Sequence, residues 1–153
     1  MKNYISHSEN ETKKIAEEFA KKTKGHIFAL TGELGAGKTI FVQGFAKGLG
    51  VKDKIISPTF VLIRQHQIPK SSKTLYHIDL YRLENTESLK HLGLEEILSD
   101  PNNTILIEWA EKIEKFLPKN TIKIKITKEE LYSRLISTSI TPNFSADKRS
   151  INL

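Results

Sequence analysis

The stretch of residues 32–39 constrains the fold of this chain more than any other feature. It reads G-E-L-G-A-G-K-T and matches the phosphate-binding loop pattern G-x-x-x-x-G-K-[ST]. Its glycines allow backbone angles and a close approach to phosphate that a side chain would prevent. Lys38 is expected to reach the β- and γ-phosphates of a nucleotide, and the Thr39 hydroxyl to bind the accompanying magnesium. The loop residues expected to bind the nucleotide are Glu33, Leu34, Gly35, Ala36, Gly37, Lys38 and Thr39.

The flanking sequence supports this interpretation. Residues 26–31 form an apolar run without a helix or strand breaker, as expected for a buried strand. Downstream of Lys38, apolar residues recur at helical spacing up to Leu49, and Gly48 and Gly50 mark the end of that helix. The free N–H groups at the start of this helix would face the same phosphates. The alternative is a glycine-rich turn that carries Lys-Thr by chance, and it does not explain the flanks.

Composition limits the classes of protein to consider. With 153 residues, the chain is expected to form one domain over residues 1–140, followed by a polar tail over residues 141–153. The sequence has no cysteine, no long apolar segment and no apolar N-terminal run, so we expect a cytoplasmic protein without membrane contact. The net charge of +6 indicates either a lysine-rich surface or a contact with a polyanion such as RNA. Because the lysines are spread along the chain, we favour the lysine-rich surface.

Periodicity and breakers predict the remaining elements. Ser8 and Glu11 form a capping-box pattern before an apolar stripe, which predicts a helix over residues 9–22. The other expected elements are a short strand over 54–56, strands over 60–64 and 75–79 joined as a hairpin, a helix over 85–98 with a break at Gly93, a strand over 104–108, a short helix around 113–117, a half-buried strand over 121–127, and a turn at 128–130 leading into 132–139.

Two acidic residues are candidates for the catalytic centre. A phosphate-binding-loop enzyme needs an acid near the magnesium, usually at the end of a neighbouring buried strand. Glu108 ends the more apolar of the two candidate strands, and Asp79 ends the other. Glu108 could bind magnesium directly or through water, or polarise the attacking water. The alternative for both residues is an ordinary strand-end acid; we favour function for Glu108, and leave the choice open for Asp79.

Other polar and aromatic residues have two interpretations each. Thr59 follows a rigid proline and is expected either to contact a γ-phosphate or to serve as a turn hydroxyl. Trp109 adjoins Glu108, so it is either a ligand platform or a core residue, and His77 is first a packing residue or a hydrogen-bond partner. Arg82 and Arg134 are either phosphate or base contacts or surface arginines.

Two missing motifs narrow the nucleotide. The chain has no N-K-x-D stretch to read guanine and no D-x-x-G after a strand, so a GTPase is unexpected. A small-molecule kinase usually carries an arginine-rich lid, whereas this chain has only four scattered arginines. A small phosphate-binding-loop kinase and a nucleotide-dependent binding module without useful turnover remain as alternatives to an ATPase.

Four sequence blocks together resemble one family. They are G-E-L-G-A-G-K-T at 32–39, S-P-T-F at 57–60, H-I-D-L-Y-R-L at 77–83 and I-E-W-A-E-K at 107–112. This combination resembles TsaE, formerly YjeE, the ATPase of bacterial tRNA threonylcarbamoyladenosine synthesis, over residues 8 to about 139. The last two blocks, in this order and spacing, are far more specific than the phosphate-binding loop. Glu33 and Ala110 depart from the residues frequent in the family, and neither affects the phosphate geometry.

The resemblance has specific implications. It implies an α/β fold of the P-loop NTPase type, with three layers and a mainly parallel sheet that has added antiparallel strands. It implies that ATP and Mg²⁺ bind at the loop, with Thr39 and Glu108 as metal ligands and with Thr12 and Arg134 near the base. The implied partners are TsaD and TsaB, which transfer threonylcarbamoyl to adenosine 37 of tRNAs reading codons that begin with A. The ATPase would support turnover of that complex, and contact with tRNA would be indirect or weak.

Overall fold

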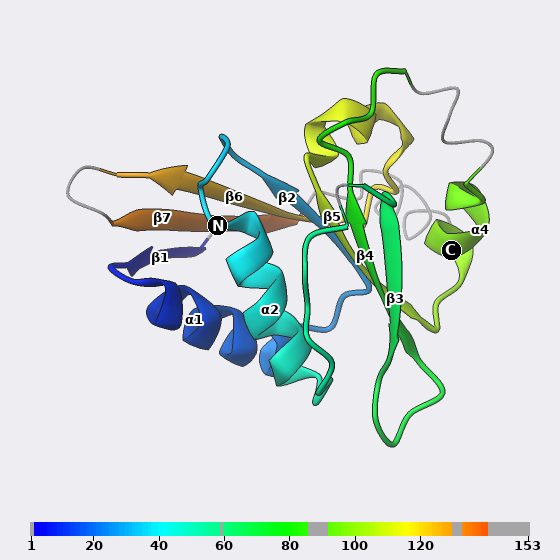
Figure 1. Ribbon diagram of the computed structural model, residues 1–153, viewed down its shortest axis with the longest axis horizontal. Coiled ribbons are helices and arrows are strands. Elements are labelled where there is room, and N and C mark those ends of the chain that lie inside the picture. The colour runs from blue at the N-terminus through cyan, green and yellow to red at the C-terminus, as the bar shows by residue number, and fades with distance from the viewer. Residues whose placement is uncertain (1, 59, 86–91, 130–132, 141–153) are drawn as a thin grey trace, which may run out of the picture.

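A seven-stranded sheet runs through the molecule in the order β1-β7-β6-β2-β5-β4-β3 (Figure 1). It is seen in a computed structural model that describes residues 2–58, 60–85, 92–129 and 133–140. The strands are β1 (Lys2–Ser6), β2 (Ile27–Thr31), β3 (Ile63–Gln67), β4 (Thr74–Asp79), β5 (Asn103–Glu108), β6 (Ile122–Lys128) and β7 (Arg134–Ile140). Strands β6, β2, β5 and β4 are parallel, and β1, β7 and β3 pair antiparallel with their neighbours. The expected fold class, a mainly parallel sheet with added antiparallel strands, is confirmed.

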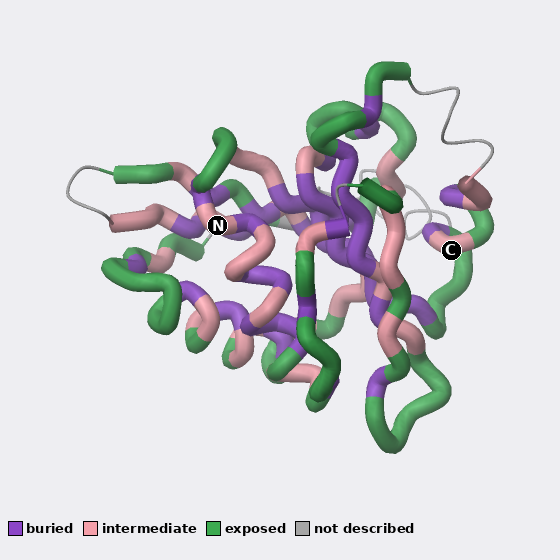
Figure 2. The backbone as a smooth tube through the Cα atoms, viewed as in Figure 1, coloured by how far each residue is buried: buried purple, intermediate pink, exposed green. Residues whose placement is uncertain are grey.

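The central strands are buried on both faces, which explains their continuous apolar sequences. In β2, Phe28 and Leu30 point to one side of the sheet and join one hydrophobic cluster, while Ile27 and Ala29 point to the other side and join a second cluster. All six residues of β5 are also buried. Figure 2 shows this buried band running along the middle of the sheet. The sheet is therefore the middle of three layers.

Helices cover both faces of the sheet. Helices α1 (Glu9–Lys22) and α2 (Lys38–Gly48) pack on the face to which Phe28 belongs. The short helix α4 (Leu94–Ser99) and the 3₁₀ helix η1 (Ala110–Phe116) pack on the opposite face. The two long helices approach closely at Gly44, where a Cβ atom would lie 2.2 Å from the carbonyl oxygen of Lys13. This close packing fixes α2, the helix that follows the phosphate-binding loop, against α1. No helix in the described part of the chain is long and apolar enough to cross a membrane.

Several local predictions are confirmed. Helix α1 has the predicted bounds, and the Ser8 hydroxyl accepts a hydrogen bond from the Glu11 backbone N–H at 3.1 Å. Strands β3 and β4 form the predicted hairpin, and β2 and α2 flank the loop at 32–37 as expected. Strands β5 and β6 lie within one residue of their predicted bounds, and the short helix near 113–117 is η1.

Two strand predictions between residues 54 and 64 are wrong, and one strand was missed. Residues 54–56 form no strand, because the Ile55 carbonyl accepts a hydrogen bond from the Gln43 side chain at 3.1 Å instead of from another strand. Residues 60–62 form a turn rather than the start of β3, because the N–H groups of Val61 and Leu62 donate to the Pro58 carbonyl. Strand β1 was not predicted; only pairing with β7, from the other end of the chain, defines it.

The predicted helix over 85–98 is wrong in its extent. Asn85, Leu92 and Gly93 are not helical, and α4 begins after Gly93, whose φ of 64° marks the predicted break. The intervening residues 86–91, the turn residues 130–132, Thr59 and the polar tail over 141–153 lie outside the described residues.

Candidate nucleotide-binding site

The loop between β2 and α2 adopts a conformation that depends on its glycines. Gly32 has a φ of 141°, and a Cβ atom there would lie 2.1 Å from the Ile126 carbonyl oxygen. Gly37, which precedes the first residue of α2, has a φ of 101°. Side chains other than hydrogen are strained at both angles. The loop therefore wraps tightly in front of the N-terminus of α2, whose first N–H groups are available to an anion.

Lys38 is the first residue of α2 and is almost fully buried, with 4% of its surface exposed. Its ammonium group donates hydrogen bonds to the carbonyl oxygens of Gly32, at 2.6 Å, and Glu33, at 3.0 Å. It also lies 3.8 Å from the centre of the Trp109 ring. Burial lowers the pKa of Lys38, and the nearby carboxylate of Glu108 partly opposes that shift. The predicted phosphate-binding cation is thus folded back on the loop and bonds to two of its carbonyls.

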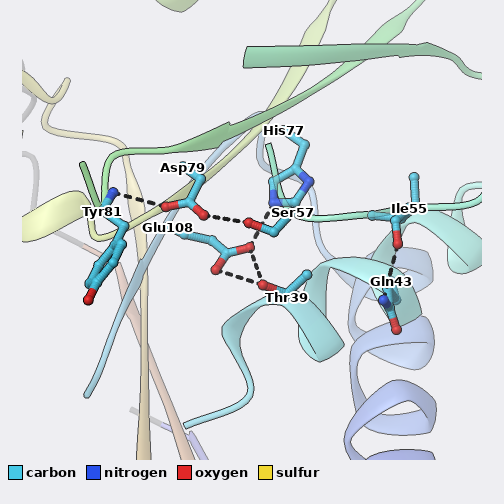
Figure 3. A network of polar contacts seen from close by, with 8 residues as sticks. All are labelled: Thr39, Gln43, Ile55, Ser57, His77, Asp79, Tyr81 and Glu108. Carbon is cyan, nitrogen blue, oxygen red and sulfur yellow. Dashed lines mark hydrogen bonds and ion pairs between the residues drawn. The ribbon is translucent and has the colours of Figure 1, made fainter. Parts of the chain in front are cut away.

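Thr39, Glu108 and His77 form a network beside Lys38 in which Thr39 is partly buried (Figure 3). The Thr39 hydroxyl lies 2.9 and 3.0 Å from the two carboxylate oxygens of Glu108. Nε2 of His77 lies 2.7 Å from Oε1 of Glu108, and both side chains are buried. The two residues predicted to hold magnesium, Thr39 from α2 and Glu108 from the end of β5, therefore face each other.

Asp79 lies next to Glu108 at the ends of the parallel strands β4 and β5, where the two residues are paired in register. One oxygen of the Asp79 carboxylate accepts from the Ser57 hydroxyl at 2.7 Å, and the other accepts from the Tyr81 N–H at 2.9 Å. Asp79 thus connects the segment around residue 57 to the two acidic strand ends (Figure 3). The sequence did not single out Ser57 or Tyr81, although both belong to the blocks that carry the family resemblance.

Trp109 has features of both alternatives that the sequence left open, a core residue and a platform beside the ligand site. It is partly buried and packs against the hydrophobic cluster on the α4 side of the sheet, as a core residue would. Its ring also contacts the Lys38 ammonium and lies 5.1 Å from the Tyr81 ring. Its backbone φ of 59° is unusual for a tryptophan and turns the chain from β5 into η1. The core packing holds the ring at the edge of the site.

These residues line one cavity of about 380 Å³. Its lining includes Glu9, Leu34, Gly35, Gly37, Lys38, Thr39, Ile40, Ser57, Asp79, Tyr81, Glu108, Trp109 and Arg134. A second hollow of about 460 Å³ shares Glu9, Gly35 and Arg134 with the first. The two hollows therefore adjoin at these three residues.

The remaining predicted residues lie in different places. Thr12 lines neither hollow; it is buried, and its hydroxyl bonds to the Ser6 hydroxyl and the Ser8 carbonyl. Arg82 is exposed and stacks on the Phe60 ring at 4.4 Å, outside the cavity lining. Thr59 lies outside the described residues.

The sequence missed Lys128, at the end of β6, which lies beside the loop. Its ammonium donates to the Leu34 carbonyl at 2.9 Å and would lie 3.2 Å from a Cβ atom at Gly35. No local signal distinguishes Lys128 from the other lysines, because it reaches the loop only through the parallel pairing of β6 with β2.

The donor atoms fit a magnesium ion that is shared with a phosphate. Mg²⁺ prefers oxygen ligands and is usually held by one or two protein oxygens together with substrate phosphates and water. The Thr39 hydroxyl and the Glu108 carboxylate provide such oxygens beside the loop. In the described part of the chain, no group of three or more His, Cys, Asp or Glu side chains could hold a metal ion by itself. The site thus has the ligands for a metal that arrives with a nucleotide.

Comparison with known proteins gives a consistent result. The model of the family described as "Threonylcarbamoyl adenosine biosynthesis protein TsaE" matches residues 6–136. The protein named tRNA threonylcarbamoyladenosine biosynthesis protein TsaE from Rickettsia bellii is 44% identical over 124 residues, which cover 80% of this chain and 83% of the relative. The protein of the same name from Bacillus subtilis is 42% identical over 117 residues, which cover 76% and 71% of the two chains.

A solved structure extends the similarity to the fold. The crystal structure of YdiB from Bacillus subtilis superimposes with a TM-score of 0.77 and 32% sequence identity, and the match covers 97% of this chain and 91% of that chain. The family match, the identities and the shared fold together show that this chain belongs to the TsaE family of threonylcarbamoyl adenosine biosynthesis proteins.

Proposed function

We propose that this protein is a Mg-ATP-binding ATPase that works with TsaD and TsaB in threonylcarbamoyl modification of adenosine 37 in tRNAs that read ANN codons. The observation that supports this most directly is the arrangement of the loop: Lys38 lies inside it, and Thr39 faces the carboxylate of Glu108 beside it. The same site would serve ATP binding and the chemistry of the γ-phosphate.

Each residue of the site has a proposed role. Lys38 contacts the β- and γ-phosphates, Thr39 and Glu108 hold the metal, and backbone N–H groups of residues 33–39 bind the phosphates. Bound Mg²⁺ would neutralise the charge that develops on the phosphates. Asp79 positions the attacking water or the Ser57 segment, since its carboxylate lies beside Glu108 and bonds to Ser57.

The second hollow, of about 460 Å³, is the proposed place for the nucleoside. Glu9, Gly35 and Arg134 line both this hollow and the cavity beside Lys38. Arg134 lines both hollows, and its Nε atom is buried without a hydrogen-bond partner among the described residues, so a ligand could provide one. Thr12 would act indirectly, through its hydrogen bonds to Ser6 and Ser8 behind this hollow. Thr59 remains a proposed γ-phosphate contact on sequence grounds alone.

The family membership supports the proposed partners, TsaD and TsaB. In this proposal the protein hydrolyses ATP slowly alone and faster with the partner complex, and it does not itself form the threonylcarbamoyl bond. Contact with tRNA is indirect or weak, and the proposed site of action is the cytoplasm.

The proposal is tested by reconstituting tRNA modification with TsaB–TsaD, a threonylcarbamoyl donor and unmodified tRNA, with or without this protein and ATP. We expect repeated turnover only when both are present, because ATP hydrolysis would reset the complex. Omitting ATP is the matched control. Equal modified tRNA in all mixtures would contradict the proposal, and transfer of labelled γ-phosphate to an acceptor other than water would favour a kinase.

Trp109 should report nucleotide binding. Phosphates that draw the Lys38 ammonium away from its position 3.8 Å from the indole ring would change the environment of the ring. Because this is the only tryptophan in the sequence, its emission can be measured without labelling. We expect the emission to change with Mg-ATP, with a midpoint equal to the dissociation constant from calorimetry. Unchanged emission at saturation would show that Lys38 stays on the ring and that the phosphates bind elsewhere.

A further inference from the structure

His77 is the buried residue of the site to which neither the loop motif nor the proposed mechanism gives a task. It lies on β4, two residues before Asp79, and none of its surface is exposed. Because side chains alternate along a strand, His77 and Asp79 point to the same face of the sheet. The parallel register pairs Asp79 with Glu108, so all three side chains meet on the face that α2 covers.

The contact between His77 and Glu108 suits a carboxylate that binds a metal. Nε2 of His77 lies 2.7 Å from Oε1 of Glu108, and because a carboxylate that binds a metal is ionised and can only accept, the tautomer that fits this role carries the proton on Nε2 and donates it. Figure 3 shows the ring directed at the carboxylate from the side opposite Thr39. The second ring nitrogen, Nδ1, is buried and has no hydrogen-bond partner among the described residues. An unpaired buried polar atom lowers the stability of the fold, so an apolar side chain would fill this space more favourably than histidine does. Packing alone therefore does not explain a histidine at this position.

We propose that His77 is a positioning residue: its Nε2–H fixes the orientation of the Glu108 carboxylate so that this carboxylate and the Thr39 hydroxyl can hold the metal of bound Mg-ATP. This inference rests on the proposed function, in which Glu108 is a metal ligand. A glutamate side chain has several rotatable bonds, and orienting it for a metal requires a partner on a rigid element. His77 is such a partner, since β4 is paired on both sides, with β5 and with β3.

The positioning role predicts a specific pattern among variants of residue 77. In His77→Gln, the side-chain amide can place an N–H near the position of Nε2, whereas His77→Asn keeps a polar amide that is too short to reach Glu108. His77→Leu removes the donor altogether. If the donor matters, Gln should behave like the wild type, and Asn and Leu should both fail. If the residue matters only for packing, His77→Gln should show no advantage over His77→Asn, although only the glutamine can bring an N–H to Glu108.

The measurement is the gain in affinity that Mg²⁺ gives to a non-hydrolysable ATP analogue, taken as the ratio of affinities with Mg²⁺ and with EDTA. Loss of a residue that orients a metal ligand typically lowers metal affinity about 10–100-fold. We therefore expect His77→Leu and His77→Asn to lose most of the Mg²⁺-dependent gain, up to that factor. Binding in EDTA should be unchanged, because the loop N–H groups and Lys38 are intact. His77→Gln should keep the gain.

A double-mutant comparison with Glu108→Ala separates this inference from the proposed function. If His77 acts through Glu108, His77→Asn should cause no further loss of the Mg²⁺-dependent gain in the Glu108→Ala protein. An unchanged gain in Glu108→Ala alone would contradict the proposed metal role of Glu108. A lost gain in Glu108→Ala, together with a retained gain in His77→Asn or an equal loss in His77→Gln and His77→Asn, would overturn the inference and leave the proposed function standing. Thermal unfolding of each variant shows which are folded, and if His77→Leu is not, the Gln–Asn comparison still decides.

Discussion

Replacing Glu108 with alanine should abolish the acceleration of ATP hydrolysis by TsaB–TsaD while ATP still binds. The phosphate contacts come from the loop and Lys38, which the substitution leaves in place, whereas Thr39 loses the carboxylate that lies 2.9 Å from its hydroxyl. Related enzymes that lack one charged group of the catalytic site are typically ~10³–10⁵ slower than the completed site. We therefore expect the partner-stimulated rate to fall by a factor in that range.

The measurement is steady-state hydrolysis with and without the partner complex, beside calorimetric ATP binding. Glu108→Gln is the closest control for shape, because its amide keeps an acceptor for Thr39 and lacks the negative charge that a metal needs. Glu114→Ala is a control for an exposed acid that lies away from the cavity lining. Two results would show that the mechanism is wrong: fast hydrolysis by the isolated wild-type protein, or full activation of Glu108→Ala by the partners.

Replacing Lys38 with alanine should abolish productive ATP binding. Lys38 is the predicted flexible cation of the loop, and its ammonium donates to the carbonyls of Gly32 and Glu33 within that loop. A hydrogen bond to a charged group is worth about 1.5–3 kcal/mol, so the affinity should fall by about 10–100-fold or more. Hydrolysis should be lost with it, since the γ-phosphate is no longer held.

Lys38→Met gives a more conservative test, because methionine fits a buried slot without introducing a charge. Lys47→Met, at the exposed end of α2, is the matched control for losing one lysine, and it should bind ATP like the wild type. The expected loss is measured by calorimetry with Mg-ATP, after thermal unfolding has shown that each variant is folded. Unchanged affinity and hydrolysis in a folded Lys38→Ala protein would exclude residues 32–39 as the nucleotide site.

The sequence predicted the parts of the fold whose signals are local. The cap at Ser8 and the glycines around Lys38 specify their own elements through contacts a few residues apart, and the structure agrees. The failures depend on contacts between distant residues. The apolar run that begins at Phe60 resembles a strand, but its first residues turn back to Pro58 and leave Phe60 83% exposed.

The same distinction applies to the site. The proximity of Lys38, Thr39 and Glu108 could be predicted, because the loop motif fixes the first two and a buried neighbouring strand ends in the third, and the structure places all three on one cavity. Their roles toward a nucleotide stay predictions. Lys128 could not be identified as a neighbour of the loop, because it comes from a strand far along the chain. The partner of His77 could not be specified either, because only the register of β4 and β5 aligns the histidine with Glu108. Both contacts depend on which strands pair and in which register, and the sequence alone does not specify either.

The order of the strands also determines when the site can form during synthesis. Strand β2, which leads into the phosphate-binding loop, lies between β5 and β6, and Ala29 is paired with Ile107 on one side and with Lys123 on the other. A ribosome must therefore translate most of the chain before the loop has its supporting neighbours. Contacts of such long sequence separation slow folding and leave the apolar β2 segment exposed until the later strands arrive. The segment that leads into the phosphate-binding loop is therefore among the last parts of the sheet to gain both of its neighbours, although it is made early.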